Sequence, residues 1–105
     1  MFDPNNFRLD GQVALVTGAG AGIGRGIARL FAGAGAAVVV SDLHAETAEA
    51  VASEIAEAGG QAVGIACNVT KEADLEAAVN TAVDRFGKLT ILVNNAGGGG
   101  PKPFD

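Results

Sequence analysis

The sequence predicts an α/β protein built on a doubly wound parallel sheet with strand order 3-2-1-4. Four short apolar runs, at residues 13–18, 37–42, 62–69 and 91–97, are continuous rather than alternating. Continuous runs are typical of strands buried on both faces of a parallel sheet. Three segments with helical periodicity separate them, so right-handed crossovers should place helices on both faces.

Each helical segment has an apolar face and a glycine stop: Gly35 after the first, Gly59-Gly60 after the second and Gly87 after the third. Thr70 is expected to cap the third helix, and the glutamates of the second are expected to face water. The expected apolar faces are Ile23, Ile27, Leu30, Phe31 and Ala34 in the first helix, Ala48, Val51, Ala52, Ile55 and Ala58 in the second, and Leu75, Ala78, Val79, Ala82, Val83 and Phe86 in the third.

Composition excludes several function classes. The chain has 105 residues, which is one domain at most, and its formal charge is −5 with seven Lys and Arg. Phosphate backbones need a basic face, so nucleic acid is not an expected partner. One Cys and one His give no metal site of the usual kind, and no run approaches the roughly 18 apolar residues of a membrane span. We expect a soluble, cytoplasmic protein without a membrane partner.

The first strand runs into a glycine turn, TGAGAGIG, at residues 17–24. Its spacing is T-G-x-x-x-G-x-G. Gly18 permits a tight exit from the strand, Gly22 lets a phosphate approach the helix backbone, and Gly24 lets the helix pack on the sheet. The helix start then offers N–H groups and a favourable dipole to a pyrophosphate. The alternative is a glycine-rich turn with no ligand.

Asp42 ends the second predicted strand, where a carboxylate can accept both ribose hydroxyls of an adenosine. The same carboxylate would repel a 2′-phosphate. Ala21 and Leu43 stand where basic residues would welcome that phosphate, and Arg25 is expected to point elsewhere. The sequence therefore favours NAD over NADP. The alternative is that Asp42 only caps the second helix.

At the end of the third strand, the Asn68 side-chain oxygen could read the adenine amino group and Val69 could touch the ring, because ligands bind outside the carboxyl ends of such strands. The alternative is an Asn that serves a strand-to-helix turn. Cys67 beside it is expected to be a small buried hydrophobe.

TGAGAGIG, Asp42, C-N-V-T at residues 67–70 and N-N-A-G at residues 94–97 together resemble the short-chain dehydrogenase/reductase family. The resemblance runs from Arg8 to the last residue. It implies a Rossmann-type fold, NAD as cofactor, and hydride transfer between a secondary alcohol and its ketone. The terminal GGGGPKPFD, the MF start and SDL after the second strand resemble its steroid-acting members, so a steroid is a candidate substrate.

The resemblance also implies roles for single residues. Asn95 contacts the cofactor, the backbone of Ala96 and Gly97 lies along it, and Gly99 lies on the substrate side. Asn68 departs from the usual Asp of the family but keeps an acceptor oxygen. The full predicted cofactor-binding set is Gly18, Gly22, Ile23, Gly24, Asp42, Leu43, Asn68, Val69, Asn95, Ala96 and Gly97.

No catalytic residue is expected in this chain. The family uses a Tyr as general acid/base, supported by a Lys, a Ser and a further Asn, and this chain has no Tyr. Residues 1–105 therefore resemble the amino-terminal part of a single dinucleotide-binding domain, inactive by itself. Two alternatives remain: a non-catalytic NAD-binding fragment and an assembly fragment. The resemblance implies a homo-oligomer, a tetramer.

Overall fold

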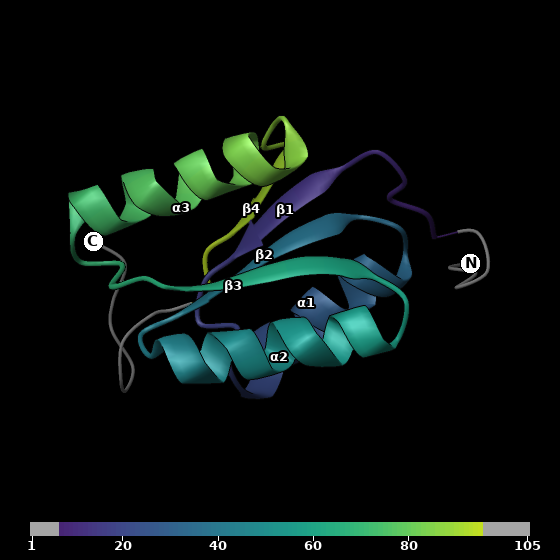
Figure 1. Cartoon of the computed structure of the whole chain (residues 1–105), viewed down its shortest axis with the longest axis horizontal. Helices are drawn as coiled ribbons and strands as arrows, with labels where there is room; N and C mark the ends of the chain where they lie inside the picture. The colour runs from purple at the N-terminus through teal and green to yellow at the C-terminus, as the bar shows by residue number, and fades with distance from the viewer. Residues whose placement is uncertain (1–6, 96–105) are drawn as a thin grey trace.

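The computed structural model describes residues 7–95, which form an open four-stranded parallel sheet with helices on both faces (Figure 1). The elements alternate strictly along the chain, as the sequence predicts. In chain order they are β1 (Val13–Val16), α1 (Gly22–Gly33), β2 (Ala37–Asp42), α2 (Ala45–Glu57), β3 (Gln61–Ala66), α3 (Glu72–Phe86) and β4 (Ile91–Val93).

The strand order is β3-β2-β1-β4, which confirms the predicted Rossmann-type topology. All neighbouring strands are parallel. Leu15 of β1 pairs with Val39 of β2 on one side and with Leu92 of β4 on the other. The register of β2 with β3 extends to Asp42 opposite Ala66. The carboxyl ends of all four strands therefore meet at one edge of the sheet.

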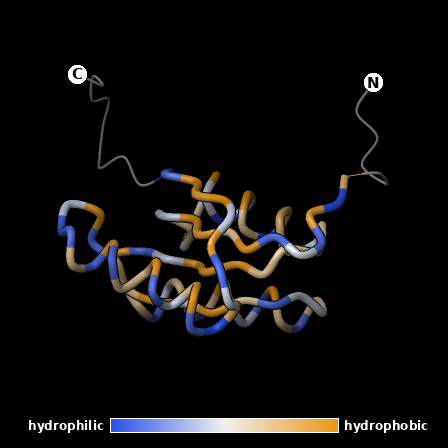
Figure 2. The backbone as a smooth tube through the Cα atoms, turned by 90° about the horizontal axis from the view of Figure 1, so that it is seen from above, coloured by the Kyte–Doolittle hydropathy of each residue, from blue (hydrophilic) through white to orange (hydrophobic). Residues whose placement is uncertain are grey.

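Two apolar cores lie on opposite faces of the sheet. Val38 and Val40 point toward α1 and α2, whereas Val39 points toward α3. Figure 1 shows α3 on one side of the strands and the other two helices on the far side. The hydropathy colouring of Figure 2 shows hydrophobic segments along the central strands. Because β1 is fully buried and β2 nearly so, their sequences read as continuous apolar runs.

The helix faces confirm the sequence prediction only in part: Ala34 of the first predicted face and Ala78 and Ala82 of the third are buried. α1 buries Gly24, Ala28 and Ala32, whereas Ile23 is 76% exposed and Leu30 is 56% exposed. α3 likewise buries its small residues, Ala78 and Ala82. Val79 and Val83 of the predicted stripe are exposed, as is Ala58 at the end of α2. Ile27 and Phe31 of α1, and Leu75 and Phe86 of α3, are half-buried and pack against the two cores as predicted. Both helices therefore approach the sheet most closely through small side chains, with these larger apolar residues packed around them. The other predicted α2 residues are all buried.

Helix ends agree with the glycine stops, but the Thr70 cap was wrong. Gly87 has φ +88° and its N–H donates to the Val83 carbonyl at 2.8 Å. α3 begins at Glu72 with Lys71 as N-cap, and no side chain caps it. The Thr70 hydroxyl instead donates to Asn68 Oδ1, as described below. β2 has the bounds of its apolar run, whereas β1 ends two residues and β3 three residues before the end of theirs, because those last residues lie in the turns at the carboxyl edge.

No helix within residues 7–95 is long and apolar enough to cross a membrane.

Candidate functional site

The turn after β1 is fastened to the end of β2. The Ala19 N–H donates to the Ser41 carbonyl at 2.9 Å, and the buried Ser41 hydroxyl donates to the Val16 carbonyl at 3.1 Å. Gly18 and Gly22 have φ of +62° and +60°, a region that favours glycine. The turn therefore has a fixed shape that other residues at these two positions would strain.

The space around the glycines differs from one to the next. A Cβ added at Gly22 would meet nothing within 4 Å, so the first turn of α1 is open to a ligand. A Cβ at Gly24 would overlap the Gly18 carbonyl oxygen and lie 2.6 Å from Asn95 Nδ2. Open N–H groups at a helix start suit an anion such as a phosphate. This geometry fits a dinucleotide. Gly22 faces the open space where the ligand would lie, and Gly24 allows the helix to pack close to the sheet.

Asp42 stands beside this turn as the last residue of β2, half-buried. Gly20 lies directly against its carboxylate. The N-cap of α2 is His44, which makes no side-chain cap bond, so the idea that Asp42 caps this helix is wrong. Among the described residues we find no hydrogen bond to the carboxylate, which can therefore accept bonds from a ligand. Leu43, next to it, is 58% exposed.

The basic residue nearest in sequence to the glycine turn is engaged elsewhere. Arg25 donates through Nε and Nη2 to the two carboxylate oxygens of Glu54, both at 2.9 Å, and so joins α1 to α2. Hydrogen bonding to Arg25 lowers the pKa of Glu54, and the same bonds raise the pKa of Arg25. Glu54 is thus an ion-pair partner, unlike the water-facing residue that the sequence suggested.

Asn68 lies in the turn between β3 and α3. Its Oδ1 accepts bonds from the Thr70 N–H at 3.0 Å and the Thr70 hydroxyl at 2.6 Å, and its own N–H donates to Asp74 Oδ2 at 2.9 Å. An amide oxygen has two lone pairs, so this one is already used. The turn role of Asn68 is therefore present, and the adenine role by its oxygen stays a prediction. Val69 beside it packs against the core beneath α3.

Asn95 brings the end of β4 to the glycine turn. Its N–H donates to the Thr17 hydroxyl at 2.9 Å, and its Nδ2 donates to the Gly18 carbonyl at 3.2 Å. The Thr17 hydroxyl also lies 3.2 Å from Asn94 Oδ1, to which it donates. The amide side chain thus supports the turn.

The predicted residues Gly18, Asp42, Asn68 and Asn95 lie at or just after the ends of four different strands and gather at the carboxyl edge of the sheet. Ala96, Gly97 and Gly99 lie outside the described residues. Three further residues contribute that the sequence did not indicate: Thr17, Gly20 and Thr47 of α2, whose methyl group lies close to Gly20 beside the Asp42 carboxylate. Thr17 is part of the glycine motif, but nothing in the sequence shows its contact with the end of β4. Cys67 is buried, which raises the pKa of its thiol, as expected of a structural cysteine.

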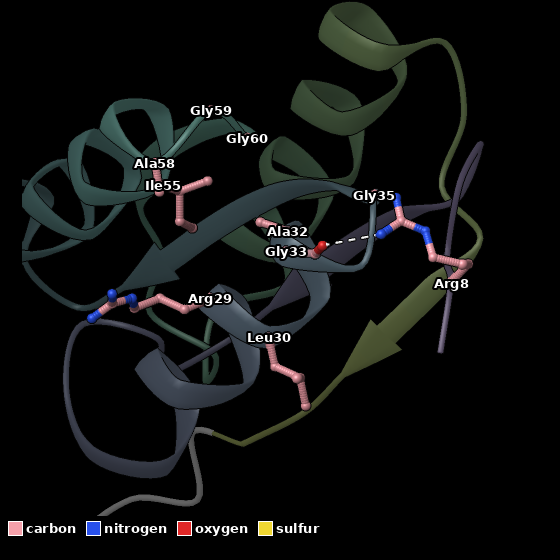
Figure 3. Close-up of a pocket in the computed structure, with 10 residues that line it drawn as sticks. All are labelled: Arg8, Arg29, Leu30, Ala32, Gly33, Gly35, Ile55, Ala58, Gly59 and Gly60. Carbon is pink, nitrogen blue, oxygen red and sulfur yellow. Dashed lines mark hydrogen bonds between the residues drawn. The ribbon is translucent and has the colours of Figure 1, made fainter. Parts of the chain in front are cut away.

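A cavity of about 490 Å³ lies elsewhere, where α1 and α2 end (Figure 3). Arg8 lines it, pairs with Asp10 at 2.8 Å and reaches the Gly33 carbonyl at 3.4 Å, whereas Arg29 points away from Arg8. Helix carboxyl ends present carbonyl oxygens and disfavour anions. This cavity is therefore a poor place for phosphates and is separate from the candidate site.

A family model described as short chain dehydrogenase matches residues 12–105. The chain belongs to the short-chain dehydrogenase family. It is 57% identical over 105 residues to 7α-hydroxysteroid dehydrogenase of Escherichia coli K12, covering all of this chain and 41% of that protein. It is 49% identical over 96 residues to the mitochondrial borneol dehydrogenase of Lavandula x intermedia, covering 90% of this chain and 35% of that one.

A solved structure of 7α-hydroxysteroid dehydrogenase complexed with NADH and 7-oxo glycochenodeoxycholic acid matches with a TM-score of 0.88 and 57% identity. The match covers all of this chain and 41% of that one. The chain thus spans about two-fifths of the length of these hydroxysteroid dehydrogenases.

Proposed function

We propose that the protein binds NAD(H) at the carboxyl edge of its sheet and serves hydride transfer between a secondary alcohol and its ketone. The observation that carries the proposal is Asp42, whose carboxylate accepts no bond from the described residues and stands beside an open helix start. The 7α-hydroxyl of a steroid or bile acid is the first candidate substrate. Its support is the 57% identity to 7α-hydroxysteroid dehydrogenase and the 7-oxo bile acid in the matched complex.

Different residues of the chain would bind different parts of the dinucleotide. The open first turn of α1 at Gly22 takes the pyrophosphate, the Asp42 carboxylate accepts the ribose hydroxyls, and Asn95 holds the turn in place. Ile23 and Leu43, both exposed, flank this region. The bound dinucleotide would supply or accept the hydride. Gly99 is assigned to the substrate side by resemblance, and we assign no catalytic residue among residues 1–105.

Cofactor preference follows from charge. A carboxylate at the ribose accepts two hydroxyls but repels a 2′-phosphate, and the nearby Arg25 is bound to Glu54. We expect NADH to bind more tightly than NADPH. Asp42→Ala should lower the ratio of the dissociation constants for NADPH and NADH about tenfold, since hydrogen bonds to a charged group contribute about 1.5–3 kcal/mol.

Isothermal titration calorimetry with both dinucleotides at matched salt measures this preference. Asp84→Ala, which removes an exposed carboxylate from α3, is the matched control and should keep the wild-type ratio. Equal affinity for both dinucleotides in the wild type would contradict the role of Asp42. A wild type that binds neither would overturn the proposed function.

A further inference from the structure

Gly20 makes room for the Asp42 carboxylate. A Cβ added at residue 20 would overlap Asp42 Oδ2 and the Thr47 methyl group, and would lie 2.8 Å from Asp42 Cγ. Gly20 is not among the glycines with positive φ, so its backbone conformation does not demand glycine. Glycine is needed there for the space that the carboxylate fills.

That space lies between three elements. The turn carries Gly20, the end of β2 carries Asp42, and the first half of α2 carries Thr47. The bond from the Ala19 N–H to the Ser41 carbonyl, 2.9 Å long, fixes the turn against the residue before Asp42. Turn and strand end therefore cannot separate freely, and a side chain at residue 20 would have to displace the carboxylate.

The carboxylate can give way where backbone cannot. The atom overlapped at residue 20 is the free end of a short side chain that accepts no bond from the described residues. At Gly24 the overlapped atom is the Gly18 backbone carbonyl oxygen. An alanine at residue 20 should thus turn Asp42 to another rotamer while the fold survives.

We propose that Gly20 is a specificity-determining position that acts through Asp42, by allowing the carboxylate to lie against the glycine turn where it meets the adenosine ribose. This inference rests on the proposed NAD(H) function and adds to it. Because residue 20 has no side chain, the Asp42 carboxylate can point toward the glycine turn. Discrimination against a 2′-phosphate thus depends on two positions, one of which carries no side chain.

The test is the ratio of dissociation constants for NADPH and NADH, measured by calorimetry on the whole protein. Gly20→Ala should lower this ratio about tenfold, the loss expected when charge-assisted hydrogen bonds to ribose are misdirected. Gly26→Ala is the matched control. It is also a glycine-to-alanine change near the start of α1, its Cβ would meet nothing within 4 Å, and it should keep the wild-type ratio.

A double-mutant cycle separates action through Asp42 from a general effect on the turn. In an Asp42→Ala background, Gly20→Ala should change the ratio no further. An equal drop in both backgrounds would overturn the inference. A wild-type preference for NADH that survives Gly20→Ala unchanged would overturn it while leaving the proposed function intact, whereas a wild type that binds neither dinucleotide overturns both.

A second variant keeps the test possible if Gly20→Ala folds poorly. Gly20→Ala/Thr47→Ser removes the methyl group from the overlap and leaves the carboxylate in it. A lowered ratio in this folded double variant supports the inference, and a wild-type ratio contradicts it.

Discussion

Gly18, Gly22 and Gly24 are glycine for different physical reasons. The first two have positive φ, and Gly22 also faces open space, whereas Gly24 has Gly18 and Asn95 where its side chain would be. The sequence predicts that these positions need glycine, because the spacing follows a strand and opens a helix. It could not predict the need at Gly20, because that depends on contacts with residues in β2 and α2.

We expect Gly24→Ala to lower the free energy of unfolding by about 1–3 kcal/mol, because the added methyl group would overlap backbone that cannot rotate away. Gly26→Ala on the same helix should instead stabilise the protein by up to about 1 kcal/mol, since alanine is the better helix former. Urea denaturation followed by circular dichroism compares the two. Similar urea midpoints for both variants would mean that the close contact at Gly24 does not affect the free energy of unfolding.

At the scale of elements, the sequence predicts the alternation of strands and helices, but it predicts the buried face of α1 only in part. Hydrophobic periodicity predicts that large apolar residues such as Ile23 and Leu30 are buried. In the structure, however, the residues of α1 that are buried against the sheet include the small Gly24, Ala28 and Ala32. Small side chains allow a close approach, and their low hydrophobicity hides them in the pattern. α2 was predicted well because Val51 and Ile55, its large apolar residues, do face the sheet.

Close packing also joins β3 to α2. A Cβ at Gly64 would lie 2.6 Å from the carbonyl carbon and oxygen of Ala48 and 2.7 Å from the Glu49 nitrogen. Gly64→Ala should therefore push the strand from the helix and destabilise the protein by about 1–3 kcal/mol. Gly33→Ala, which meets nothing within 4 Å, is the control. Thermal unfolding measures both, and a Gly64→Ala protein with the wild-type Tm would contradict this packing.

At the scale of the whole molecule, β4 has a strand partner on one side only among the described residues. Leu92 on this strand is 61% exposed. The strand order is the one that the sequence predicts for a doubly wound sheet of this type. The sequence did not predict the exposure of Leu92, because hydropathy marks a residue as apolar without telling which surface covers it.

A polypeptide limited to residues 1–105 should self-associate through this edge, since an open strand edge with apolar side chains pairs readily with another chain. Leu92→Lys should reduce the association by placing a charge there. Leu43→Lys changes a leucine of similar exposure in the loop after β2 and should leave the association unchanged. Light scattering without dinucleotide measures the mass of each, and a monomeric wild-type polypeptide would rule out pairing at this edge.

The bonds from Asn95 to Thr17 and Gly18 also suggest an order for folding. They join residues 78 and 77 positions apart in the chain. Closing so long a loop carries an entropy cost that is recovered only when the strands between have paired. We expect the glycine turn and Asp42, which are closer together in sequence, to assemble before Asn95 joins them. We therefore expect a folding chain to form the turn before it gains the amide that supports it.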